Sequence, residues 1–246
     1  MHHHSVKIII KKVPLFFTIF ITTMIILSGC SEEPPTSDTV TDKDGNIYQT
    51  VTIGTQTWMV ENLKTTTFND GTPIPLVSSD NDWSNLSTPG YSWYNNDEAS
   101  YKNTYGALYN WDAVNTGKLA PKGWHVATDA EWRMLERYVK THVGPSGTIA
   151  KALAATSNWS TFPDAGTIGS DLTINDSSGF SGIPGGYRHA EGTFNLIGIF
   201  GHWWTSTEAT NDTEKAWLHY MTYDYSNVYT YYYDKSFGFS VRCVMD

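Results

Sequence analysis

The chain has 246 residues, enough for one large domain or two small ones, and 14% of them are aromatic. Charged residues make up only 17% of the chain and apolar residues 40%, which is typical of a globular protein and not of a disordered one. The formal net charge of -9 argues against a nucleic-acid partner, which would need a basic surface.

Residues 1–29 are predicted to be a lipoprotein signal peptide. Three lysines precede an apolar run over residues 13–27, which is shorter than the roughly 20 residues of a membrane-spanning helix. The run closes with "LSGC", which resembles the bacterial lipobox. This resemblance implies that Cys30 is diacylated on its sulfur and becomes the new N-terminus. A plain signal peptide or an N-terminal anchor helix is the alternative.

Residues 30–41 are predicted to be a flexible tether, because they are rich in Pro, Ser, Thr and acidic residues and have nothing to bury. Glu32 and Glu33 resemble the surface-export signal of Bacteroidetes-type lipoproteins. We therefore expect an exported protein that is lipid-anchored to the outer membrane and faces the cell surface. Since an acidic chain does not bind anionic lipid by charge, the acyl chains on Cys30 are its expected membrane contact. Cys243 then has no partner for an intramolecular disulfide.

The segment that follows the tether predicts a β-hairpin or meander. Asp44-Gly45 is a turn signal, and apolar residues alternate between positions 51 and 58. The Asp and Asn residues at 42, 44 and 46 also permit a calcium-loop hypothesis. The glycine is misplaced for such a loop and no Glu follows at the required spacing, which favours an ordinary turn. Residues 68–88 are predicted to be loop.

Helices are predicted in the middle of the chain. Thr128 and Glu131 form a capping-box pattern, and apolar residues at 132, 135 and 139 then define one helix face that ends near Gly144. Apolar spacing also predicts a helix over residues 108–114 and a shorter one over 149–155.

Beyond residue 175 the chain is rich in glycine and aromatic residues, which favours short strands. Alternation predicts a strand over 217–223, a turn at "DYSN" and a returning strand over 228–233. The block "FGFSVRCV" predicts a last strand with Phe239, Val241 and Cys243 on one face. The order of strands, then helices, then strands indicates an α+β fold.

Several ordered blocks carry a family resemblance: "YGALYNWDAVNTGKLAPKGWHVATDAEWRML", "IPGGYR", "WWTSTE" and "GFSVRCV". Together they resemble the Fibrobacter succinogenes major paralogous domain, over residues 42–246. The family implies a secreted or lipid-anchored protein. Its members commonly have Cys where this chain has Ser92 and Ala120, so any bridge between these positions is missing here. Tighter core packing is then expected to replace the stability that such a disulfide would contribute.

A more distant resemblance links "GWHVATDAEWRMLERYV" and "FGFSVRCV" to formylglycine-generating enzymes. It implies a C-type-lectin-like fold, with two to three helices packed on a small, twisted, mostly antiparallel sheet. The oxidase chemistry of those enzymes needs two cysteines for copper, and here the domain has Cys243 alone. The histidines are scattered, without a metal-binding spacing: His125, His142, His189, His202 and His219.

We therefore expect no enzymatic activity, no cofactor and no metal. Two weaker hypotheses concern residues 95–98, "NNDE": calcium binding, or glycoside hydrolysis by Asp97 and Glu98. Neither follows from spacing alone, and a solvated loop is the simpler interpretation.

Seven of the 15 tyrosines lie between residues 220 and 233. Tyrosine offers a large contact area at a small entropy cost, as in antibody paratopes. Alternation predicts that Tyr229, Tyr231 and Tyr233 share one strand face and that Tyr232 opposes them. The segment also resembles the rewritten region of diversity-generating retroelement proteins. By that analogy the candidate ligand-binding residues are Tyr220, Thr222, Asp224, Tyr225, Asn227, Tyr229, Tyr231, Tyr232 and Tyr233. The tryptophans of the family blocks, at 111, 124, 132, 203 and 204, are expected in the core.

The favoured function is a surface receptor or adhesin that binds an extracellular protein or cell-surface partner through this tyrosine-rich segment. A glycan-binding module is the first alternative, because stacked rings with Asn and Asp also suit sugars. An enzyme of unknown chemistry and a purely structural aromatic hairpin are the others.

Overall fold

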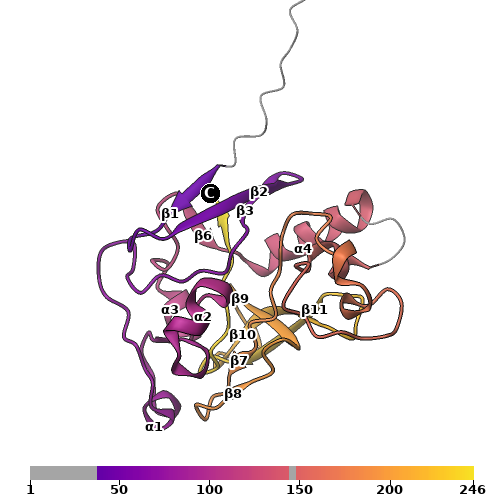
Figure 1. Ribbon diagram of the computed structural model, residues 1–246. Coiled ribbons are helices and arrows are strands. Elements are labelled where there is room, and N and C mark those ends of the chain that lie inside the picture. The colour runs from indigo at the N-terminus through magenta and orange to yellow at the C-terminus, as the bar shows by residue number, and fades with distance from the viewer. Residues whose placement is uncertain (1–37, 144–147) are drawn as a thin grey trace, which may run out of the picture. The chain divides into compact units, whose positions relative to one another are not determined.

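The computed structural model describes residues 38–143 and 148–246, and it arranges them as antiparallel sheets with helices packed beside them (Figure 1). The chain is therefore α+β, as the order of predicted elements indicates. The signal peptide, Cys30, the two glutamates after it and Gly144 lie outside the described residues. No helix within the described ranges is long and apolar enough to cross a membrane.

The first sheet has five strands in the order β1-β2-β3-β12-β6. Its C-terminal strand β12 lies between β3 and β6, so the end of the chain closes a sheet that its beginning starts. In Figure 1 the C-terminus accordingly lies beside β1 and β2. The strands are β1 (Thr39–Thr41), β2 (Ile47–Ile53), β3 (Gln56–Met59), β6 (Trp124–Val126) and β12 (Cys243–Met245).

The start of this sheet corrects one prediction and confirms another. Residues 39–41 were expected in the tether, but they form β1, because these β-branched residues pair with β2 and Val40 packs against the core. The turn that follows is an ordinary one. The carboxylate of Asp42 accepts hydrogen bonds from the Asp44 and Asn46 N–H groups, each at 2.9 Å, and from the Tyr48 hydroxyl at 2.6 Å.

The second sheet has three antiparallel strands in the order β11-β10-β9, with β11 at the edge (Figure 1). They are β9 (Phe200–Glu208), β10 (Lys215–Thr222) and β11 (Tyr229–Asp234). The predicted strands and the turn between them are thus confirmed, with boundaries shifted by one or two residues. Two smaller pairs complete the strands: β4 (Tyr91–Ser92) with β5 (Leu108–Tyr109), and β7 (Tyr187–Arg188) with β8 (Phe194–Asn195).

The described residues contain five α-helices where two to three were predicted: α1 (Asp80–Ser84), α2 (Glu98–Tyr105), α3 (Trp111–Asn115), α4 (Asp129–Tyr138) and α5 (Ile149–Leu153). Helix α4 begins at the predicted capping box and continues into a π-helical turn, Val139–Val143. The helix predicted over 108–114 is wrong at its start. The Asn110 side chain accepts from the Ala113 N–H and begins α3, while the preceding residues form β5.

Two helices were missed because they bury almost nothing. Helix α1 lies within the stretch predicted to be loop, where the Ser79 hydroxyl caps it and Trp83 is its single buried residue. Helix α2 is capped by Asp97 and has no buried residue. Without an apolar face, neither helix leaves a periodic signal in the sequence. The cap at Asp97 also gives a structural role to the segment "NNDE".

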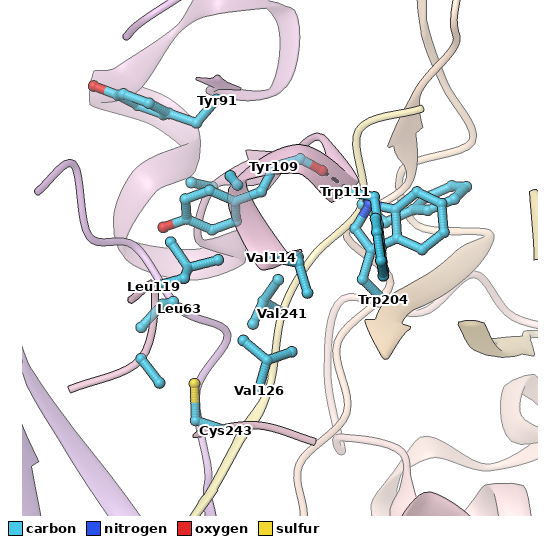
Figure 2. Close-up of a cluster of buried hydrophobic side chains, with 14 of the residues drawn as sticks. Leu63, Tyr91, Tyr109, Trp111, Val114, Leu119, Val126, Trp204, Val241 and Cys243 are labelled. Atoms are coloured by element: carbon cyan, nitrogen blue, oxygen red, sulfur yellow. Dashed lines mark hydrogen bonds between the residues drawn. The ribbon is translucent and has the colours of Figure 1, made fainter. Parts of the chain in front are cut away.

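The core consists of two clusters of buried side chains. In the first, shown in Figure 2, the Trp204 indole N–H donates to the Tyr109 carbonyl at 3.0 Å. In the second, Trp58 and Trp132 meet edge to face at 5.3 Å. Of the tryptophans expected in the core, Trp124 is half-buried and the other four are buried. Ser92 and Ala120 are buried too, and the Ser92 hydroxyl has no hydrogen-bond partner.

The closing block is mostly irregular, and only its end is a strand. Phe239, Val241 and Cys243 lie together in the first cluster, as the predicted alternation requires. Before β12 the chain makes isolated bridges to three different segments, so no regular ladder can form. On the opposite side Arg242 is fully buried and donates to the carbonyls of Met59, Phe180 and Ser181, each at 2.8 Å. These bonds connect the end of the chain to both halves of the fold.

Candidate functional site

An aromatic ladder crosses the three-stranded sheet. His202 on β9, Tyr220 on β10 and Tyr229 on β11 are direct cross-strand partners. The ring centroids of His202 and Tyr220 are 5.5 Å apart and those of Tyr220 and Tyr229 are 5.3 Å apart, with interplanar angles of 26° and 22°. Tyr225, from the loop before β11, then meets Tyr229 edge to face at 5.6 Å. The ladder therefore runs from the sheet interior to the surface.

The inner end of the ladder rests on the apolar core. His202 is buried and stacks on Phe200 at 5.2 Å and on Phe239 at 5.0 Å. Burial lowers the pKa of His202 to about 3, so its ring is neutral at physiological pH. Its Nδ1 atom has no hydrogen-bond partner among the described residues. His202 therefore contributes a flat ring to the ladder and no charge.

The outer end of the ladder is exposed. Tyr225 and Tyr231 are 52% and 51% exposed, and both lie at or beside the edge strand. The Tyr231 ring lies 5.3 Å from that of Tyr233, which is half-buried and contacts Phe237 at 5.0 Å. An exposed ring is thus supported by a neighbour that is itself fixed on the core.

The rings of β11 follow the predicted alternation. Tyr229, Tyr231 and Tyr233 contact one another or their neighbours on the ladder side. Tyr232 turns to the other side, where it meets Trp217 of β10 edge to face at 5.2 Å. Its ring also stacks on that of Tyr231 at 5.1 Å. This contact is possible because β11 is an edge strand of the sheet within the described residues.

The nine candidate residues occupy three environments. Tyr225, Asn227, Tyr231 and Tyr232 are exposed, whereas Tyr220, Asp224, Tyr229 and Tyr233 are half-buried. Thr222 is only 4% exposed, and its hydroxyl donates to the Asp224 carboxylate at 2.7 Å. The structure therefore does not place Thr222 at the surface, where the sequence prediction put it.

No tyrosine hydroxyl of this segment is buried without a hydrogen-bond partner in the described structure. Burial, followed by the effect of the neighbouring phenols, raises the pKa of Tyr220, and the same two causes raise that of Tyr233. The hydroxyls of Tyr220 and Tyr233 therefore stay protonated at physiological pH and can donate hydrogen bonds.

His219 attaches helix α4 to the back of the sheet. Its fully buried imidazole lies between the carboxylates of Asp129 at 3.0 Å and Glu136 at 2.7 Å, and it stacks on Trp132 at 5.1 Å. Burial alone would lower the pKa of His219, but the hydrogen bonds to both carboxylates outweigh it and raise the pKa. His125 is similarly bonded, to Glu131 and Asp246.

The carboxylates beside these two histidines have a structural role. In the part of the chain that the structure describes, no three His, Cys, Asp or Glu side chains come together in a way that could hold a metal ion. The charged groups around His219 instead fix α4 against β10.

One feature beside the candidate residues was not predicted. Trp217, Tyr232 and the loop before β10 line a hollow of about 210 Å³. The alternation in β10 places Trp217 on the side opposite Tyr220, which was visible in the sequence. That the loop at 209–212 folds back over this side was not, because it has no periodic pattern.

A comparison with known protein families identifies the chain's relatives. The model of the Fibrobacter succinogenes major domain matches residues 51–245, which is most of the chain. No curated protein and no solved structure matches it significantly. The chain therefore belongs to the Fibrobacter succinogenes major domain family.

Proposed function

We propose that this protein is a non-enzymatic, surface-displayed receptor or adhesin that binds a protein partner through a tyrosine face. The tyrosine face consists of Tyr225, Tyr229 and Tyr231. The observation that carries the proposal is that Tyr225 and Tyr231 are exposed at or beside the edge strand β11, and that Tyr225 rests on the half-buried Tyr229, which belongs to a ladder of stacked rings that reaches the core.

The physical basis is contact area offered at low entropic cost. A tyrosine side chain has few rotatable bonds, and stacking restricts it further before any partner arrives. Apolar ring faces exposed together mark interaction sites on soluble proteins. Asn227, which lies between Tyr225 and Tyr229 in the chain, is exposed and supplies a polar group at the rim, as protein-binding surfaces usually have.

The proposal includes how the protein is held and how it varies. Cys30 carries the lipid that anchors the chain to the outer membrane, and the fold is C-type-lectin-like. Labelling with radioactive palmitate should mark the native protein and leave Cys30→Ser unlabelled.

The tyrosine-rich segment can also be tested for diversification by a retroelement. If it is diversified in this way, a near-repeat of its DNA that differs at adenines should lie beside the gene. Absence of that repeat would leave the receptor proposal intact and remove the diversification.

Retention on cell surfaces tests the function. Bacteria displaying the full-length protein would be washed over a panel of immobilised cells and surface proteins. We expect at least one surface to retain the native protein and to release a Tyr225→Ser/Tyr231→Ser variant. Ile47→Ser is the matched control, since Ile47 is 60% exposed on a strand of the other sheet. Equal retention of native protein and double variant on every surface would contradict the proposal.

A further inference from the structure

The hollow beside Tyr232 has two aromatic walls. The rings of Trp217 and Tyr232 are 5.2 Å apart and stand at 87° to each other, so they form a corner. The loop between β9 and β10 closes the other sides, and the volume is about 210 Å³. The remaining lining residues are Ala209, Thr210, Asn211, Asp212 and Lys215. Ladder and hollow lie on opposite sides of the same sheet.

An irregularity in the sheet fixes the wall formed by Trp217. The pairing of β9 with β10 shifts between Ala216 and Leu218, so three residues of β9 stand opposite Trp217 alone. The Thr205 hydroxyl of this bulge donates to the Trp217 carbonyl at 2.8 Å. Bulges re-aim side chains and are frequent next to functional sites. Trp217 is half-buried, and its indole N–H is neither buried nor bonded to another described residue.

The charges in the hollow cancel each other. The Lys215 ammonium lies 3.0 Å from the Asp212 carboxylate, which also accepts from the Glu214 N–H at 3.1 Å. The same ammonium lies 5.7 Å from the Tyr232 ring centroid. An anionic ligand would meet the carboxylate, and a cationic ligand would meet the ammonium that already covers the aromatic face. The hollow therefore favours a neutral ligand that can both donate and accept hydrogen bonds.

We propose that this hollow binds one ring of a neutral saccharide. A sugar ring has an apolar C–H face that can stack on the Trp217 ring, while the Lys215 ammonium lies over Tyr232, and it has hydroxyls around its rim that match an amide, a carboxylate and an ammonium. The hollow is smaller than the roughly 300 to 1,000 Å³ of pockets for drug-sized ligands, so it fits a single ring. None of Tyr225, Tyr229 and Tyr231 lines the hollow, so the site differs from the tyrosine face, although the Tyr231 ring stacks on that of Tyr232 at 5.1 Å.

Saturation-transfer NMR with the full-length protein tests the site. The probes are the methyl glycosides of glucose, galactose and mannose, with glucuronate and choline as charged comparisons. We expect at least one neutral glycoside to bind with a Kd on the order of 1 mM, because one ring makes few contacts. Tyr232→Ala and Asn211→Ala should each weaken that binding by about tenfold.

The matched control is Tyr225→Ala, which removes an exposed ring that contacts Tyr229 and does not line the hollow, and it should leave the saccharide Kd within about twofold. Circular dichroism would show that each variant is folded. The proposal is overturned if no neutral glycoside receives saturation, if Tyr232→Ala binds as well as the native protein, or if glucuronate or choline binds more tightly. Failure of the saccharide proposal would not affect the proposal for the tyrosine face, because that face is tested by cell-surface retention of the Tyr225→Ser/Tyr231→Ser variant.

Discussion

Replacing His219 by alanine is expected to destabilise the protein by about 3 kcal/mol. The imidazole is fully buried, and it bonds to Asp129 and Glu136, whose side chains are each 19% exposed. Its removal leaves two carboxylates largely out of water without their shared cation. It also removes the ring that stacks on Trp132 and so opens a cavity between α4 and β10.

The magnitude follows from the surroundings of each carboxylate. Removing one partner of a buried ion pair costs about 3 to 5 kcal/mol. Asp129 keeps its 2.7 Å bond to Arg133, which reduces the loss towards the lower end of that range. The lost stacking contributes ~1 kcal/mol or less on top. For a protein of this length about 3 kcal/mol corresponds to a fall in Tm of roughly 6 to 12 °C.

The stability that His219 contributes depends on pH in a predictable direction. Because the pKa of His219 is raised, its stabilisation is complete below the ordinary value of 6.5 and is lost as the pH rises through the raised value. Although burial opposes it, the bonds to His219 and Arg133 lower the pKa of Asp129, so a second loss occurs as the pH falls through that lowered value. Native protein and His219→Ala should therefore differ most in mildly acidic solution.

Urea unfolding of both proteins across the pH range measures this difference. His142→Ala is the control, because His142 is exposed and should cost less than about 1 kcal/mol. The stabilising role of protonated His219 is contradicted if His219→Ala lowers the free energy of unfolding as little as the control does. It is also contradicted if the difference between native protein and variant grows as the pH rises above 8.

Three further substitutions test other parts of the fold by the same unfolding assay. Thr128→Ala removes the cap of α4 and should cost about 1 kcal/mol, and no loss would contradict the capping box. Arg242→Lys should cost more than 3 kcal/mol, because lysine cannot reproduce the planar set of bonds to three carbonyls; a neutral result would refute that role. Ser92→Ala should be neutral or stabilise by ~1 kcal/mol, since the hydroxyl is buried without a partner, and a large loss would reveal a missed bond.

The sequence predicted best the elements that carry strong local signals. The capping box at Thr128 places the start of α4, and the alternation after residue 216 places β10 and β11. The opposed positions of Tyr231 and Tyr232 follow from the same two-residue period. In each case one pattern within a dozen residues decides the outcome.

The features that the sequence did not predict depend on contacts between residues far apart in the chain. Residues 39–41 have the composition of a tether but pair with β2, and nothing in the local sequence indicates that the Thr222 side chain is buried. The ladder needs His202, which lies 18 positions before Tyr220 and carries no pattern of its own. The hollow beside Trp217 depends on a bulge and a loop, and neither has a sequence signal. These features arise from pairing between strands.

The dissociation constant of the protein from a surface partner identified by retention measures how much the tyrosine face contributes to binding. Measured by surface plasmon resonance, Tyr225→Ser/Tyr231→Ser should raise the Kd by about 30-fold, as expected when interface hot spots worth about 2 kcal/mol are removed. Ile47→Ser should leave the Kd unchanged. A double variant that binds the partner as tightly as the native protein would show that the tyrosine face is not the binding surface.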